Sequence, residues 1–131
     1  MKIYRQVVAL ACALMLFAAC ASVKMTTNTN GLDLVSGKTN VKHVNGKASG
    51  LYLLWFPLIT GNTDDPGMFM PAFLNDTVNL DAVAGMMTKG AKESGASAIT
   101  DLTSSRSAMP VLPIPFVFMW YSVQMSGNIV K

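Results

Sequence analysis

This chain of 131 residues has few side chains of the types that carry catalysis or bind metals. It has one histidine, His43, and two cysteines, Cys12 and Cys20, and only 13% of its residues are charged. A structural zinc site needs four Cys or His ligands at short spacings, and a Ser or Cys nucleophile needs a neighbouring base, for which only His43 is present. We therefore expect no metal site, no cofactor, no catalytic residue and no enzymatic activity.

Charge is also nearly balanced, with 10 Lys and Arg against 7 Asp and Glu. Two of the cations, Lys2 and Arg5, come before an apolar run, residues 7–19, and loss of that segment would leave eight cations against seven anions. A nucleic-acid-binding domain keeps a basic stripe or patch. The remaining lysines are scattered along the sequence, so we expect no nucleic-acid partner.

The apolar run has the organisation of a secretory signal, with cations before it and small residues at its end. As a helix, residues 7–19 would rise only about 20 Å, which is short of the roughly 30 Å hydrocarbon core of a bilayer. Residues 1–19 are therefore predicted to be a signal peptide.

Residues 16–20, Leu-Phe-Ala-Ala-Cys, resemble the lipobox of bacterial lipoproteins, although Phe17 stands where leucine is usual. The resemblance implies cleavage between Ala19 and Cys20 and a diacylglycerol on the Cys20 thiol, the lipoprotein site that also carries palmitate. In lipoproteins that are sorted by the next residue, Ala21 in place of Asp implies the outer membrane, facing the periplasm. An ordinary signal cut and an uncleaved membrane anchor are the alternatives.

The rest of the chain is predicted to be one domain without a disulfide. If Cys12 leaves with the signal and Cys20 is acylated, no cysteine pair remains. Residues 20–31 are polar and rich in Thr and Asn, and they predict a flexible tether between the lipid and the domain. Residues 32–131 are long enough for a single hydrophobic core.

One segment of this domain has the pattern of an amphipathic helix. Residues 79–94 begin with Asn79, a residue type that caps helices well, and place Val83 and Met87 on one face. Gly95 suits the left-handed position that ends many helices. Because two internal glycines weaken the helix, we expect its apolar face to pack on a sheet.

The other periodic segments predict strands. Residues 51–56 form a short aromatic-rich run, residues 96–103 follow the helix, and from Tyr121 apolar and polar residues alternate up to about Val130. Residues 59–71 contain Gly, Pro and Asp and predict a loop. This order predicts an α+β fold, with a small, mostly antiparallel sheet of about four strands and one helix packed on one face.

Aromatic residues gather around Trp55 and Trp120 in greater number than a small core needs. They either pack inside the domain or form an exposed patch that meets the bilayer or a partner subunit. A third interpretation places a small apolar ligand between the sheet and residues 57–74, in a pocket lined by Trp55, Phe69 or Phe73.

Three segments resemble the TRL-like family of small bacterial lipoproteins: residues 45–50 (Asn-Gly-Lys-Ala-Ser-Gly), 95–101 (Gly-Ala-Ser-Ala-Ile-Thr-Asp) and 123–131. The resemblance implies a small non-enzymatic envelope domain and transfers no catalytic residue. We expect a lipid-anchored structural or interaction module, with the bilayer as partner through Cys20 and with a protein partner or a second copy as further candidates. A module that binds an apolar ligand is the second hypothesis, and a hydrolase using His43 as its base is the third.

Overall fold

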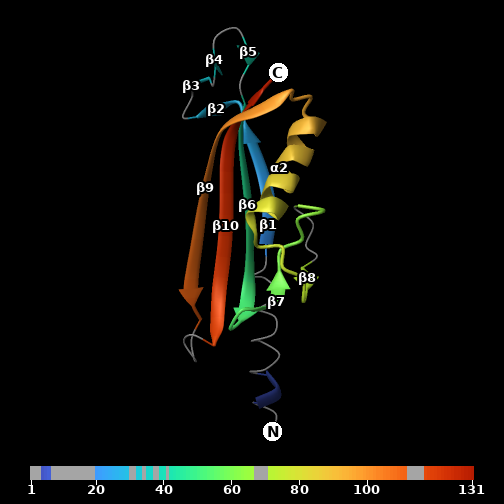
Figure 1. Cartoon of the computed structure of the whole chain (residues 1–131), viewed down its shortest axis with the longest axis vertical. Coiled ribbons are helices and arrows are strands. Elements are labelled where there is room, and N and C mark those ends of the chain that lie inside the picture. The colour runs from blue at the N-terminus through green and yellow to red at the C-terminus, as the bar shows by residue number, and fades with distance from the viewer. Residues whose placement is uncertain are drawn as a thin grey trace.

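The computed structural model describes residues 4–6, 20–29, 32–33, 35–36, 39–40, 42–66, 71–111 and 117–131. An antiparallel sheet of long strands carries the helix α2 (Leu80–Glu93) on one face (Figure 1). Its strands are β1 (Cys20–Thr26), β6 (Lys42–Leu53), β7 (Phe56–Thr60), β8 (Ala72–Phe73), β9 (Ala98–Pro110) and β10 (Phe118–Val130). Two small ladders join β2 (Asn28–Thr29) to β3 (Leu32–Asp33) and β4 (Val35–Ser36) to β5 (Thr39–Asn40).

The long strands β6 and β10 form the centre of the sheet. The strand order is β8-β7-β6-β10-β9, and β1 also pairs with β6. On the side of β6 away from β10, β1 pairs with residues 43–49 and β7 pairs with residues 50–53. Two strands that are distant in sequence therefore meet end to end along one side of β6.

The helix α2 forms as its sequence predicts. The side chain of Asn79 caps it by accepting a hydrogen bond from the N–H of Ala82 at 2.8 Å, and Gly95 follows in the left-handed conformation, with φ +76°. The predicted apolar face is confirmed, since Val83 and Met87 are buried against the sheet.

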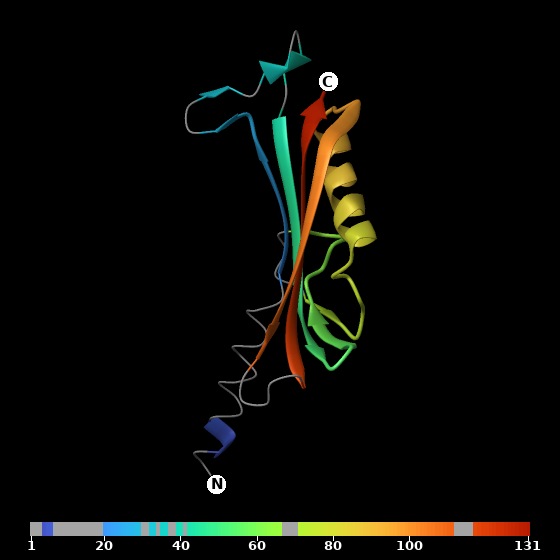
Figure 2. The ribbon, with the colours of Figure 1, turned by 60° about the vertical axis from the view of Figure 1, so that its left-hand side comes forward.

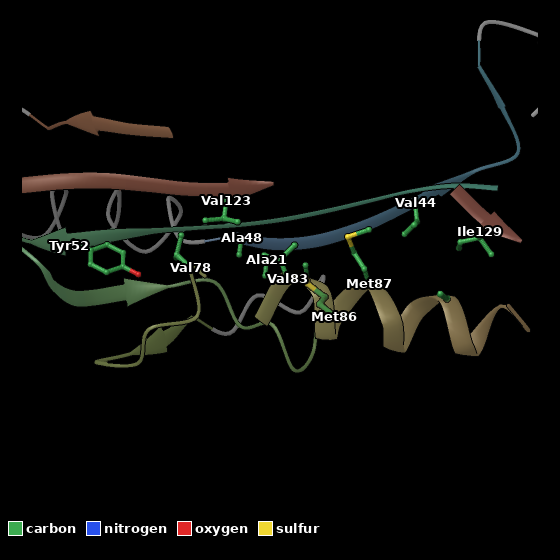
Figure 3. Close-up of a cluster of buried hydrophobic side chains, with 11 residues drawn as sticks. Ala21, Val44, Ala48, Tyr52, Val78, Val83, Met86, Met87, Val123 and Ile129 are labelled. Carbon is green, nitrogen blue, oxygen red and sulfur yellow. The ribbon is translucent and has the colours of Figure 1, made fainter. Parts of the chain in front are cut away.

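The hydrophobic core lies between α2 and one face of the sheet, as the edge-on view in Figure 2 indicates. Figure 3 shows the helix side chains of Val83, Met86 and Met87 directed toward this face. Gly46 lets the helix approach closely, because a Cβ at this position would lie 2.6 Å from Cγ of Met87. The sheet residues buried in this core are Ala21, Val44, Ala48, Tyr52, Val123 and Ile129.

The expected fold class is correct in outline, with a mostly antiparallel sheet and one helix on it, but the sheet has six strands instead of about four. Part of the predicted loop, residues 59–71, belongs to β7, and β8 follows that loop at once. The strand predicted at residues 96–103 is part of β9, which continues to Pro110. Its polar second half remains a strand because β9 lies at the edge of the sheet, where both faces are exposed.

The predicted flexible tether, residues 20–31, is wrong over its first part. Residues 20–26 are β1, paired with β6 from Cys20 opposite Ser49 to Thr26 opposite His43. Ala21 is only 6% exposed and belongs to the core. The period-two alternation that places Ala21, Val23 and Met25 on the core face is what makes this polar-looking segment a strand. Residues 20–26 therefore belong to the sheet and not to a flexible tether.

Candidate functional site

Cys20 stands at the first position of β1, with an exposed side chain and a free thiol. Its backbone is held in the sheet, because the Ser49 hydroxyl donates a hydrogen bond to the Cys20 carbonyl oxygen at 3.2 Å. The N–H of Gly61, in turn, donates to the carbonyl oxygen of Ser49 at 3.0 Å. The thiol is thus accessible for modification on a residue whose main chain is fixed.

Gly61 is the contact between the start of β1 and the end of β7. A Cβ at position 61 would overlap the backbone of Cys20 and Ala21. Any larger residue here must displace one of the two strands. A group attached to the Cys20 sulfur is therefore joined directly to the sheet, with no flexible residue between them.

The face of the sheet opposite α2 carries every second residue of the strands. We call it the free face because α2 does not cover it; Ser49 and Leu51 on this face are nevertheless buried. Cys20 projects from it, since directly paired residues point to the same side of a sheet and Cys20 pairs with Ser49, an odd-numbered residue of β6. The core takes even-numbered residues of β6 instead, among them Val44 and Ala48. Cys20, Ser49, Ser122 and Ser107 form one cross-strand row on the free face.

On one side of this serine row the free face is entirely apolar. The next row crosses five strands in pairing contact, and it consists of Phe73, Ile59, Leu51, Trp120 and Met109. The row after that consists of Phe56, Leu53 and Phe118. We call these eight residues the apolar half of the free face; Leu54 and Trp55 form the turn at its end.

Several side chains of the apolar half and its turn are open to solvent. Trp55 is 82% exposed, Met109 60% and Phe73 59%, whereas Leu51 at the centre is 4% exposed. All residues of the apolar half except Phe73 come from two stretches without charge: residues 48–63 and 107–130 contain no Asp, Glu, Lys or Arg. Exposed apolar side chains grouped in this way, with no charge among them, make this half a candidate interaction surface.

On the other side of the serine row the free face is polar. Its rows are Ser22, Lys47, Gln124 and Ser105; then Lys24, Asn45, Ser126 and Thr103; then Thr26, His43, Asn128 and Thr100. The two charged side chains in these rows, Lys24 and Lys47, are both cations and both exposed. We call these three rows the polar half of the free face.

His43 takes part in a side-chain network at the far end of the polar half. Its Nδ1 lies 3.1 Å from Oδ1 of Asn128, and Nδ2 of Asn128 donates to the Asp101 carboxylate at 3.0 Å. Thr100 also donates to that carboxylate, at 3.2 Å. Asp101 is one of the few non-glycine residues at positive φ, +53°, close to the irregularity in the β9–β10 pairing. The network ties three strands together and brings no Ser or Cys nucleophile to His43 through a described hydrogen bond.

Tyr52 and Asp76 form a short polar contact on the core side. The Tyr52 hydroxyl donates to Oδ1 of Asp76 at 2.6 Å, and its ring meets that of Tyr121 edge to face at a centroid distance of 4.8 Å. Burial, and then the hydrogen bond to the Asp76 carboxylate, raises the pKa of Tyr52 well above its usual range. This hydrogen bond connects Asp76, in the segment before α2, to Tyr52 in β6.

The structure brings three of the predicted aromatic residues, Trp55, Phe73 and Trp120, to one end of the sheet. Trp120 and Phe73 belong to the same row, separated by Leu51 and Ile59, and Trp55 lies in the adjoining turn. Phe69 and the predicted cleavage residue Ala19 lie outside the described residues. The pairing of Met109 and Phe118 with this group was not anticipated, although the charge-free stretches that contain them are visible in the sequence.

A cavity of about 310 Å³ lies on the other side of the molecule, between α2 and β9. Its lining is mostly apolar, with Met87, Ile99, Leu102 and Met125, and also includes Lys92. Two further hollows are lined by residues around Lys89 and around Arg106. The ligand pocket that we expected beside Trp55 and Phe73 is not one of these three.

Within the described part of the chain, no three His, Cys, Asp or Glu side chains are grouped so that they could hold a metal ion. Among the same residues, no helix has both the length and the apolar character needed to cross a membrane.

Comparison with known proteins adds no further identification, since no family model, no curated protein and no solved structure matches this chain. The resemblance to the TRL-like lipoproteins therefore stays a prediction that rests on the residues quoted above.

Proposed function

We propose that this protein is a bacterial cell-envelope lipoprotein, held by lipid on Cys20, whose domain is a non-enzymatic structural or interaction module. The observation that carries the proposal is the position of Cys20. Its exposed thiol follows a signal-like segment in sequence and projects from the free face, at the row where apolar residues give way to polar ones. Ala21 favours the outer membrane, facing the periplasm, as the location.

The surroundings of His43 support a module without catalysis. The histidine joins a network that links strands through Asn128 and Asp101. General-base catalysis requires the base within hydrogen-bond reach of the proton that it removes. We therefore propose a structural role for His43 and not the hydrolase scheme.

Intact mass of the membrane fraction tests the lipid anchor. We expect wild-type protein to begin at Cys20 and to carry lipid mass, and the Cys20→Ser variant to lose that mass. The matched control is Cys12→Ser, which changes the other cysteine of the chain and should leave the lipid in place. A wild-type product that begins elsewhere, or that begins at Cys20 without lipid, contradicts the proposal.

A second candidate function is binding of a small apolar molecule, and the cavity between α2 and β9 is what favours it. Its volume of about 310 Å³ lies at the lower end of the range for ligand pockets. The Leu102→Lys substitution would place a charge in its apolar lining. If the cavity holds an apolar ligand, mass spectrometry of organic extracts should detect the ligand in wild type and not in this variant, whereas extracts without any bound compound contradict this candidate.

A further inference from the structure

We propose that the apolar half of the free face docks on the lipid bilayer itself, so that the domain lies against the membrane in one orientation. This inference rests on the proposed function, because it takes the lipid on Cys20 as given. It adds the surface that meets the membrane and the direction in which the domain faces.

The first argument is that the lipidated side chain of Cys20 and the apolar half lie on the same face of the sheet. The Cys20 side chain projects from the serine row, and Leu51 and Trp120 lie in the adjoining row. Rows on one face are two residues apart, or about 7 Å along the strands. Lipid on the Cys20 sulfur therefore brings the bilayer surface within about 7 Å of the first apolar row.

The second argument is that no flexible segment separates Cys20 from the sheet. Ser49 and Gly61 hold its backbone in register. A tethered domain would be free to turn away from the bilayer, whereas this one must remain close to it once Cys20 is acylated. The exposed side chains of Trp55, Phe56 and Phe73 then meet lipid instead of water, and aromatic residues such as tryptophan are enriched at this depth of a membrane.

The third argument is the order of side chains along the free face. Apolar rows come first, then the row of Cys20 and serines, then exposed Lys47 and Lys24 in the next two rows. Amphipathic surfaces that lie on membranes place apolar residues about 5–10 Å into the interface and cations at the level of anionic headgroups. The order of rows along the free face, first apolar, then lipidated and then cationic, matches this arrangement of membrane-bound amphipathic surfaces.

A second copy of the chain is a weaker candidate for this surface. Five strands at about 4.8 Å and two rows at about 7 Å make the apolar half roughly 300 Å² in area. A stable protein–protein interface buries about 800 Å² on each partner. The apolar half is too small by itself to hold a dimer, but it suffices to orient a domain that its lipid already anchors.

The two tryptophans of the chain make the proposal directly measurable, since Trp120 lies in the apolar half and Trp55 in its turn. Acylated protein that begins at Cys20 would be extracted from cell membranes, checked by intact mass for lipid on Cys20, and reconstituted in vesicles of phosphatidylethanolamine and phosphatidylglycerol. Phosphatidylcholine brominated at a shallow or a deep acyl position would then be added as a quencher. We expect shallow bromines to lower the tryptophan emission at least two-fold, and deep bromines to lower it less.

Lysine substitutions distinguish docking of the apolar half from mere proximity of the tryptophans to the vesicle surface. Phe73→Lys together with Met109→Lys places charge in the apolar half at two exposed positions, and we expect it to restore at least half of the lost emission. The matched control places two lysines in one row of the polar half, Gln124→Lys with Ser105→Lys, and should leave the quenching unchanged. Circular dichroism of each variant checks that the sheet is intact.

Several outcomes would overturn the proposal. Acylated protein whose tryptophan emission is unaffected by bromine overturns the docking but not the lipid anchor, and this holds even if the lysine variants fail to fold. If bromine does not quench the tryptophan emission and native mass spectrometry shows dimers, the apolar half is the contact surface of a second copy of the chain, and the docking proposal is overturned. Absence of lipid on Cys20 in the preceding mass measurement overturns the proposed function instead, so the two failures are distinguishable.

Discussion

The two faces of the sheet are made by the same strands, yet their apolar residues serve different purposes. On the core face, Val44 and Ala48 are fully buried under Met87 and the rest of α2. On the free face, apolar residues occupy one half and polar residues the other, and Met109 and Phe73 stay more than half exposed. Burial within the fold explains the first set, whereas the second set forms the surface that we propose to dock on the bilayer.

The largest expected difference between the faces is in the free energy of unfolding. Met87→Ala removes a buried side chain that is 1% exposed and should destabilise the domain by about 2–5 kcal/mol. Met109→Ala, its matched control on the free face, should change stability by less than about 0.5 kcal/mol. Urea unfolding followed by circular dichroism measures both, and equal losses for the two variants would mean that the apolar half belongs to the core.

The attachment of β1 to the sheet can be tested at Gly61. Gly61→Ala pushes a methyl group into the backbone of Cys20 and should cost about 1–3 kcal/mol. Gly85→Ala is the control, because a Cβ there meets nothing within 4 Å and should stabilise α2 by up to about 1 kcal/mol. Hydrogen exchange of residues 20–26 should quicken only in the first variant, and unchanged exchange would argue that β1 is a loosely held tether after all.

The Tyr52–Asp76 pair on the core side should contribute less. Tyr52→Phe removes the hydrogen bond and should cost about 1 kcal/mol at neutral pH. Because the folded state raises the pKa of Tyr52, the contribution is present in full below the unfolded pKa of about 10 and is lost as the pH rises beyond it. Wild type and variant should therefore converge in stability in alkaline solution.

Tyr121→Phe is the control for that experiment, since Tyr121 shares the ring contact without the hydrogen bond to Asp76. Urea midpoints measured between pH 7 and about 11 would show the convergence. A difference between wild type and Tyr52→Phe that stays constant over this range would refute the coupling between ionisation and folding.

The smallest effect on stability is expected at the turn of the free face. Trp55→Ser removes a large side chain that is 82% exposed and should shift the free energy of unfolding by less than about 0.5 kcal/mol. Trp120→Ser, which removes a partly buried side chain from the row itself, should cost more. Chemical unfolding in detergent measures both, and a large loss at Trp55 would place this turn within the folded core.

Local patterns in the sequence predicted the helix and the last strand well, because their signals lie within a few residues of each other. Asn79 caps α2 and Gly95 ends it, and the alternation after Tyr121 ends at Val130 as expected. The strand β1 was missed because its partner is remote: Cys20 pairs with Ser49 across 29 positions, and only that pairing orders the segment.

The candidate site was predictable residue by residue but not as a surface. Cys20, Trp55, Phe73 and Trp120 were each singled out from the sequence. Their relation depends on strand register, which places Met109, Trp120 and Leu51 in one row. Register is set by packing of the opposite face against α2, and a slip of one residue would exchange the two faces.

By itself, the sequence determined where α2 begins and ends, that few groups are available for catalysis, and that a cysteine follows a signal-like segment. Only the tertiary structure decided that Cys20 begins a strand and that its side chain shares a face with an apolar half and a polar half. The physical reason is that helix caps and alternation are interactions between near neighbours, whereas a sheet face is assembled from strands that meet only after the chain has folded.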